Sequence, residues 1–221
     1  MNNILAKIAK FNLKTIFFNL HYFPFRTAIK FPVFVSANTK ILHRGGKVVL
    51  EGKIKPGMVE LGYGHLGNFD KMNSRFVWDN LGTVTFQENA FIGHGSKIKV
   101  LPTGSIYFGA NFITTAESSF ISRKSIRIGS NCLFSWEILV MDTDFHFMYD
   151  EQGTVMNPDA DITLGDNVWV GCRCLILKGA IIPTNSVIAA ATTVTKKLRE
   201  ENSIYAGMPV AKVKSFGYWK L

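Results

Sequence analysis

Cysteine is scarce in this sequence, and its arrangement excludes a disulfide framework. There are three cysteines, Cys132, Cys172 and Cys174, an odd number without the spacing of a disulfide-stapled domain. No histidine or further cysteine lies at zinc-ligand spacing from them, so we expect no metal site. The cysteines therefore favour a reducing compartment, and we expect a cytoplasmic protein.

Acidic residues are absent from the first 50 positions. Glu51 is the first acid, and eight basic residues precede it: Lys7, Lys10, Lys14, Arg26, Lys30, Lys40, Arg44 and Lys47. The remaining chain has 17 basic residues against 16 acidic ones, so it is close to neutral. The net charge of +9 is thus a property of the N-terminal segment alone. We expect no nucleic-acid partner.

The chain also lacks a long apolar run. Its N-terminal apolar stretches are too short and too often interrupted by lysine to span a bilayer. No small-residue cleavage site follows an uninterrupted apolar core, which argues against a signal peptide.

An apolar residue does return at every sixth position near the C-terminus. The series is Leu164, Val170, Ile176, Ile182, Ile188 and Val194. Four residues after each of the first five comes a residue of modest volume: Val168, Cys174, Ala180, Ser186 and Thr192. A period of six is neither helical nor that of an ordinary strand. It is typical of a β-helix, in which three short strands make one triangular coil and coils stack on their neighbours. An antiparallel sandwich is the alternative that the unbroken run disfavours.

The same phase continues towards the N-terminus. It passes through Phe86, Ile92, Ile98, Phe108, Ile128, Phe134 and Val140. Between residues 99 and 127 we expect bulges or small loops, near Pro102, Gly104 and Arg123-Lys124. We therefore predict an all-β chain with a basic, aromatic helical or capping segment at 1–47 and a β-helix domain at 48–221.

The N-terminal segment predicts an amphipathic helix up to about His21. Ile4, Ile8, Phe11, Thr15 and Phe18 share one face, and Lys7, Lys10 and Lys14 share another. Two interpretations stay open and are not exclusive. The helix caps the open end of the solenoid or packs within an oligomer, or residues 1–30 make peripheral contact with an anionic membrane.

The repeat breaks between Val140 and Leu164. Its phase would place His146, Gln152 and Pro158 in inward slots, which a packed core does not accept without partners. We therefore expect the chain to leave the coil in a loop at about 145–161. Loops on rigid scaffolds often carry catalytic groups. An imidazole titrates near neutrality, and a carboxylate can orient it. Asp144 or Asp142 could do so for His146. His94 lies at an outward repeat position, where we expect a solvated face.

These features together resemble the hexapeptide-repeat acyltransferases, and within them the O-acetyltransferases of sugars and bacterial surface polysaccharides. The resemblance covers about residues 84–214. It rests on the hexads and on four segments: Asp142–His146, Ile162–Gly171, Val194–Lys196 and Tyr205–Pro209.

The resemblance implies a left-handed parallel β-helix and a homotrimer. Acetyl-CoA and a sugar or glycan acceptor, either free or linked to a nucleotide or lipid, would meet in a cleft between neighbouring prisms. His146 would be the general base for direct attack of a sugar hydroxyl on the thioester. The product would belong to lipopolysaccharide, capsule or exopolysaccharide. The enzyme would be cytoplasmic or peripheral at the inner face of the cytoplasmic membrane.

The resemblance also implies which residues line the acetyl-CoA channel, and it implies no metal. Trp169 and Gly171 match positions beside the pantetheine channel, where a missing Cβ lets a ligand approach. Ala189 and Ala190 match the next coil. Thr195, Lys196 and Lys197 match the nucleotide end, where a lysine could meet a phosphate. Lys212 stands one position later than the family pattern, which puts a phosphate contact there in doubt.

Other functions fit the sequence less well. An N-acetyltransferase of an amino sugar nucleotide is the nearest alternative. A non-catalytic glycan-binding scaffold would leave the loop entrance and the Trp169 segment unexplained. A γ-type carbonic anhydrase needs three histidines, two of them a few residues apart, whereas here even a nearest pair such as His43 and His65 is 22 positions apart.

Overall fold

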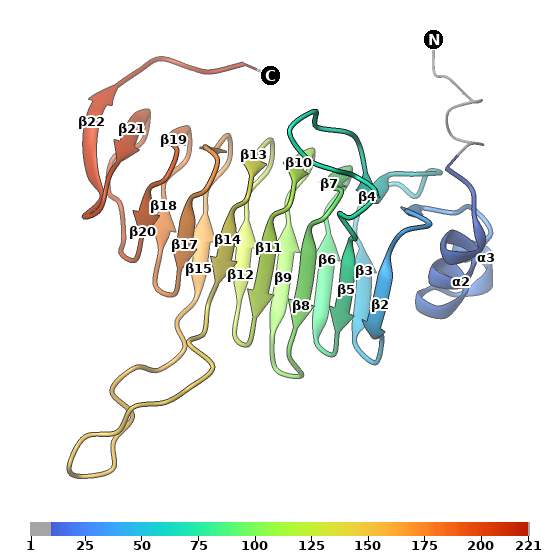
Figure 1. Cartoon of the computed structure of the whole chain (residues 1–221), viewed down its shortest axis with the longest axis horizontal. Coiled ribbons are helices and arrows are strands. Elements are labelled where there is room, and N and C mark those ends of the chain that lie inside the picture. Colours follow the sequence, from blue (N-terminus) through green and yellow to red (C-terminus); the bar gives the residue numbers. More distant parts are fainter. Residues whose placement is uncertain (1–9, 221) are drawn as a thin grey trace.

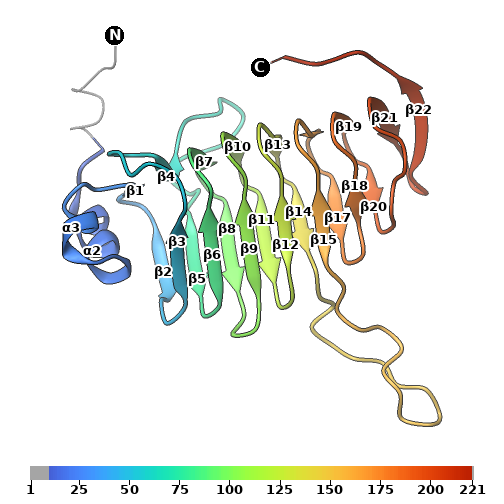
Figure 2. The same cartoon turned by 180° about the vertical axis from the view of Figure 1, so that it is seen from behind.

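Short strands follow one another into three sheets that form the faces of a triangular prism (Figures 1 and 2). The structure is a computed structural model that describes residues 10–220. Every strand pairing within the prism is parallel, apart from the last hairpin. The fold is the expected left-handed parallel β-helix.

Each complete coil contributes one strand to each sheet. Sheet A holds β1 (Val33–Val35), β4 (Val59–Tyr63), β7 (Ala90–Gly93), β10 (Phe112–Ala116), β13 (Leu133–Trp136), β16 (Trp169–Val170), β19 (Ser186–Ile188), β21 (Ser203–Ala206) and β22 (Ala211–Ser215). Sheet B holds β2 (Lys40–His43), β5 (Val77–Asn80), β8 (Lys97–Val100), β11 (Ser119–Ser122), β14 (Leu139–Met141), β17 (Leu175–Leu177) and β20 (Thr193–Val194). Sheet C holds β3 (Lys47–Leu50), β6 (Thr83–Phe86), β9 (Ser105–Phe108), β12 (Ile126–Ile128), β15 (Ile162–Leu164) and β18 (Ile181–Ile182).

The repeat positions form the core, as the hexads predict. The six apolar positions from Leu164 to Val194 and the five small positions between them are buried. The middle of the prism is filled by a column of aromatic rings with neighbouring centres 4.8–5.9 Å apart: Phe86, Phe108, Phe112, Phe120 and Phe134. Burial of these side chains against adjacent coils is the main stabilising term of a solenoid.

The region of imperfect repeats keeps the solenoid path. The chain turns at Leu101–Gly104, where Gly104 N donates to Leu101 O at 2.8 Å, and it bends at Arg123-Lys124. Two small loops therefore stand where the sequence predicts them.

The helix α2 (Leu13–Tyr22) closes the N-terminal end, followed by the short α3 (Phe25–Ala28) (Figure 1). The outer edge of β1 has backbone groups that no strand pairs, and α2 satisfies them with side chains. Asn19 bonds both the N–H and the carbonyl of Val33, and Thr15 does the same for Val35. The helix thus covers an edge that would otherwise be open to pairing.

Two features of this end differ from the prediction. The helix begins at Leu13, after the N-cap residue Asn12, and Ile4, Lys7 and Ile8 lie outside the described residues. Strands β1, β2 and the start of β3 lie before residue 48, at which the sequence analysis placed the domain boundary. Within residues 10–220, no helix is long and apolar enough to cross a membrane.

Two segments leave the solenoid. Residues 142–161 form the predicted loop between β14 and β15, which projects far from the prism (Figure 1). Residues 64–76, between β4 and β5, form a second one that the sequence did not indicate. The prediction that His94 lies on a solvated face is wrong, because the second segment covers it. His94 is 1% exposed, and its Nδ1 lies 2.9 Å from the Ser74 hydroxyl.

Candidate functional site

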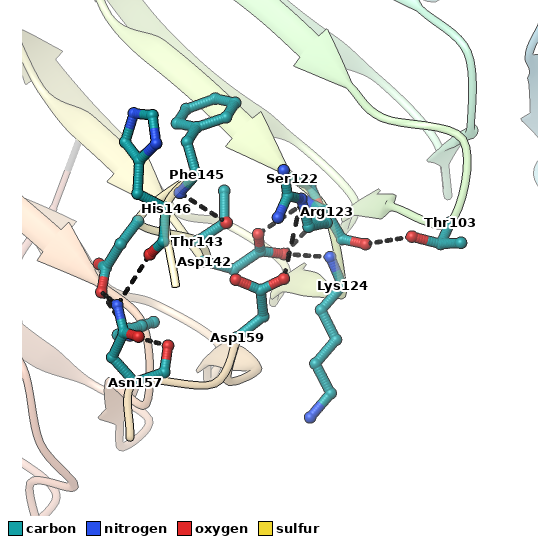
Figure 3. Close-up of polar contacts among 12 residues, drawn as sticks. Thr103, Ser122, Arg123, Lys124, Asp142, Thr143, Phe145, His146, Asn157 and Asp159 are labelled. Carbon is teal, nitrogen blue, oxygen red and sulfur yellow. Dashed lines mark hydrogen bonds and ion pairs between the residues drawn. The ribbon is translucent and has the colours of Figure 1, made fainter. Parts of the chain in front are cut away.

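The loop of residues 142–161 leaves the corner between sheets B and C. Its entrance is fixed by Asp142, which is fully buried. The Asp142 carboxylate accepts hydrogen bonds from Ser122 Oγ at 2.7 Å and from the backbone N–H groups of Arg123 and Lys124 at 2.7 and 3.0 Å (Figure 3). All three donors belong to the turn of the preceding coil. Asp142 therefore ties the root of the loop to the solenoid.

Asp144 belongs to a different network. Its Oδ2 accepts from Asn157 Nδ2 at 2.9 Å and forms an ion pair with Lys178 Nζ at 2.5 Å. The hydrogen bond from Lys178, then that from Asn157, lower the pKa of the Asp144 carboxyl. Asn157 Nδ2 also donates to the backbone carbonyl of His146 at 2.9 Å. The two arms of the loop are thus clamped together beside His146, and Lys178 holds the clamp on the next coil.

The His146 side chain is exposed, and its ring projects away from these polar contacts (Figure 3). In the described part of the chain, neither Asp142 nor Asp144 hydrogen-bonds the imidazole. Both nitrogens are therefore open to a substrate. Any influence of Asp144 on His146 passes through Asn157 and the backbone.

Aromatic side chains at the loop entrance pack against one cation. The Arg123 guanidinium lies 5.8 Å from the ring centre of Phe145 and 5.4 Å from that of Phe147. Its Nε is 3.8 Å from Asp159 Oδ2 on the returning arm. Phe145 adopts a left-handed backbone conformation with φ +62°, which is unusual for a bulky residue. The entrance is therefore shaped by packing on Arg123, a residue that the sequence analysis did not assign to the site.

The predicted cofactor residues divide between two corners of the prism. Thr195, Lys196 and Lys197 follow β20, at the same sheet B–C corner as the loop and Lys178. Trp169, Gly171, Ala189 and Ala190 belong to the sheet A–B corner. Sheet B lies between the two groups, so they do not meet at one edge of a single prism.

The sheet B–C corner carries free cations beside hollows. Thr195 and Lys196 line an open hollow of about 400 Å³ together with Met208 and Val210. Lys196 and Lys197 line the adjoining hollow and form no ion pair with any residue from 10 to 220. Lys212, by contrast, is paired with Glu200 at 2.5 Å. The first two lysines can therefore meet an anion such as a phosphate.

The sheet A–B corner carries a partly exposed indole. Trp169 is 39% exposed, and the ring of Trp219, from the C-terminal segment, lies 6.1 Å from it. A Cβ at Gly171 would stand 2.6 Å from the backbone nitrogen of Ala190. The close stacking of the coils is therefore enough to explain a glycine at this position. A ligand that approaches Gly171 is not needed to explain it. Ala189 and Ala190 lie on the next coil, the second of them exposed.

Metal-ligating residues and thiols do not form a second site in the described part of the chain. Within residues 10–220, no group of three or more His, Cys, Asp or Glu could hold a metal ion. Cys132 and Cys174 are buried at corners, as expected, and burial raises the pKa of their thiols to about 12 and about 11. They are consequently poor nucleophiles.

Comparison with known proteins gives a consistent group of relatives, although no family model matches the chain. A putative lipopolysaccharide biosynthesis O-acetyl transferase of Escherichia coli K12 is 25% identical over 149 residues, which are 63% of this chain and 75% of that protein. The galactoside O-acetyltransferase of the same organism is 27% identical over 158 residues, 69% of this chain and 72% of that protein.

A solved structure has the same architecture. The crystal structure of the polysialic-acid-specific acetyltransferase NeuO superimposes with a TM-score of 0.52 and 21% identity, covering 86% of this chain and 79% of that chain. At this identity the likeness concerns the fold.

Proposed function

Since the chain belongs to the hexapeptide-repeat acyltransferases and is similar to O-acetyltransferases of sugars, we propose that it transfers an acetyl group from acetyl-CoA to a sugar hydroxyl. The acceptor is a sugar or glycan, nucleotide- or lipid-linked, of a bacterial surface polysaccharide: lipopolysaccharide, capsule or exopolysaccharide. The observation that carries the proposal is His146, an exposed imidazole on a loop clamped by Asn157, Asp144 and Lys178.

His146 acts as the general base. Its free ring nitrogen takes the proton of the acceptor hydroxyl while the oxygen attacks the thioester carbonyl. The new C–O bond forms, the C–S bond breaks, and the proton passes to the departing CoA thiolate. A positioned base of this kind contributes about 10² to 10⁴ in rate. Asp144 and Asn157 are positioning residues, because they hold the backbone of His146 and do not touch its ring.

Acetyl-CoA binds along the walls of the two corners. Lys196 and Lys197 are unpaired cations beside hollows and suit the phosphates of the nucleotide end. The exposed face of Trp169 suits the apolar pantetheine arm, together with Gly171, Ala189 and Ala190 on the same corner. Thr195 lines the same hollow as Lys196, at the sheet B–C corner from which the 142–161 loop leaves.

A homotrimer supplies the complete site. One prism holds the loop and the Trp169 wall on different corners, so the corner of one copy completes that of its neighbour. The outer face of sheet A supports such packing, since its register places six apolar side chains in one row: Phe91, Ile113, Leu133, Trp169, Val187 and Ile204. The exposed aromatic side chains of the loop, such as Phe147 and Tyr149, would contact the sugar or a neighbouring subunit.

The test is the variant His146→Ala. Because the histidine moves a proton and does not hold CoA, we expect turnover to fall by about 10² to 10⁴ while CoA binding stays unchanged. Thiol release with a panel of glycans measures the first, and calorimetry with CoA measures the second. His65→Ala, which removes an exposed histidine outside the loop, is the matched control.

Two outcomes would overturn the proposal. Full activity of His146→Ala would show that His146 is not the general base, and transfer only to amino sugars in the same panel would favour an N-acetyltransferase.

The proposal also includes peripheral contact of residues 1–30 with a membrane. Its physical basis is the outer side of α2 and α3.

A further inference from the structure

The outer side of α2 and α3 exposes large apolar side chains. Leu13 is 83% exposed, Leu20 52%, Phe25 71% and Ile29 50%. The inner side of α2 is occupied by its contacts with β1, so these outer side chains add nothing to the core. We call them, with Phe17, the N-terminal face. An exposed apolar cluster of this kind marks an interaction surface.

Cations without a carboxylate partner accompany this face. Lys14, Arg26, Lys30, Lys40, Arg44 and Arg75 form no ion pair with any residue that the structure describes. The first acid of the chain is Glu51, so the segment that carries the face holds no carboxylate to neutralise them. Lys10, by contrast, is paired with Glu60. The face is therefore both apolar and strongly basic.

A hollow between α2 and β2 concentrates this charge. It has a volume of about 480 Å³, and Lys14, Lys40 and Arg75 line it together with Leu13 and Phe17. Burial and the nearby Arg75 lower the pKa of Lys14, so the cations here lie close together without a compensating anion. An anionic group that entered the hollow would relieve this repulsion.

The basic groups also lie beside the apolar ones. The Arg44 guanidinium is 4.8 Å from the ring centre of Phe17. The Lys14 ammonium donates to the Thr39 carbonyl, while its stem follows the hollow. Amphipathic side chains placed in this way can keep their charges in a headgroup layer while their apolar neighbours enter the lipid.

We propose that the N-terminal face docks on a bilayer of anionic lipids, with a lipid phosphate held in the hollow of Lys14, Lys40 and Arg75. The positive charge of the N-terminal face favours an anionic membrane over a second copy of the chain. A second copy of the same face would bring like charges together, whereas an anionic leaflet attracts each cation. This docking adds a membrane partner to the proposed function. It rests on the proposed function only for the identity of the acceptor sugar.

The placement of the face leaves the enzyme site free. The two helices lie at one end of the prism, and the 142–161 loop leaves near the other (Figures 1 and 2). Docking through α2 and α3 would therefore hold the solenoid with its catalytic end away from the contact. A chain anchored in this way can still bind acetyl-CoA from solution.

Vesicle flotation of the full chain tests the proposal. We expect flotation with vesicles of phosphatidylcholine plus phosphatidylglycerol, weak flotation with phosphatidylcholine alone, and release by high salt. Leu20→Ser with Phe25→Ser should abolish flotation. Lys40→Gln with Arg75→Gln should weaken it by roughly 25-fold, at about fivefold per charge. All four side chains are exposed or line the open hollow, so the fold should persist.

Matched controls stand at the opposite end. Val213→Ser removes an apolar side chain that is 61% exposed, and Lys214→Gln with Lys220→Gln removes two exposed charges. These variants should float like the parent chain. His146→Ala should float normally, and Leu20→Ser with Phe25→Ser should acetylate a soluble acceptor normally, so docking and catalysis can fail separately.

Four results would overturn the inference. The first is equal flotation with both kinds of vesicle, and the second is flotation that the control variants lose. The third is stabilisation by inorganic phosphate without flotation, which would make the hollow a site for a free anion. Concentration-dependent self-association that only Leu20→Ser with Phe25→Ser abolishes, without flotation, would assign the face to a second copy.

Discussion

Asp142 and Asp144 stand two positions apart in the sequence and have different roles in the folded chain. Asp142 is buried and accepts three hydrogen bonds from the turn below it, whereas Asp144 is exposed and pairs with Lys178. The break in the repeat identified the loop and His146. It could not distinguish the two carboxylates, because their partners lie on other coils.

Replacing each aspartate by alanine separates these roles. We expect Asp142→Ala to lower the free energy of unfolding by about 2–4 kcal/mol, since it leaves buried donors without an acceptor. Asp144→Ala should change it by less than about 1 kcal/mol, because the Asp144 carboxylate is exposed to solvent, while it lowers turnover by loosening the backbone of His146. Urea unfolding and acetyl-transfer rates measure the two effects. Equal losses of stability would contradict the assignment.

The roles of Asn157 and Lys178 in the site could not be predicted from the sequence for a related reason. Neither breaks the repeat or belongs to a recognisable motif, and both reach the site only because distant parts of the chain are brought together. His94 was misjudged because an outward repeat position implies exposure only if nothing covers it. Residues 64–76 cover it, and they follow no hexad.

At the scale of elements, the hexads predicted strands wherever coils are regular. Coils of 18 residues, such as that from Trp169 to Val187, keep the period of six. The first coils are longer, with 26 residues between the paired positions Val33 and Val59, so no fixed spacing shows there. Strands β1 and β2 were consequently assigned to the N-terminal segment. Thr15 was likewise assigned to an apolar face, although its hydroxyl caps the edge of β1.

The tight stacking of coils can be tested at Gly171. Gly171→Ala places a methyl group 2.6 Å from the backbone nitrogen of Ala190, which cannot move without shifting its coil. We expect a loss of about 1–3 kcal/mol in the free energy of unfolding. Gly67→Ala is the control, because its Cβ would meet no atom within 4 Å. Unfolding in urea measures both, and an unchanged Gly171→Ala would show that the coils are looser.

At the scale of the whole molecule, the three outer faces differ. Sheet A presents an apolar row from Phe91 to Ile204, between Glu60 on β4 and Lys214 on β22. The corresponding row of sheet C includes Thr85, Tyr107, Arg127 and Thr163. This asymmetry is the reason to assign lateral packing to sheet A.

A charge on each face tests the assignment. Ile113→Asp should dissociate the proposed trimer, since an aspartate buried between subunits lacks a partner, and acetyl transfer should fall with it. Thr163→Asp, on the outer row of sheet C, should leave the assembly intact. Light scattering after size-exclusion chromatography measures the mass of each variant. A trimer that survives Ile113→Asp and is lost in Thr163→Asp would reverse the choice of face.

Both ends of sheet A are closed by elements that break the repeat. At one end, Thr15 and Asn19 of α2 occupy the backbone groups of β1. At the other end, β22 turns back antiparallel and carries Lys212 and Lys214 on the final edge. A second prism therefore cannot extend sheet A by parallel pairing without displacing α2 at one end or β22 at the other. This closure disfavours end-to-end stacking of prisms through sheet A.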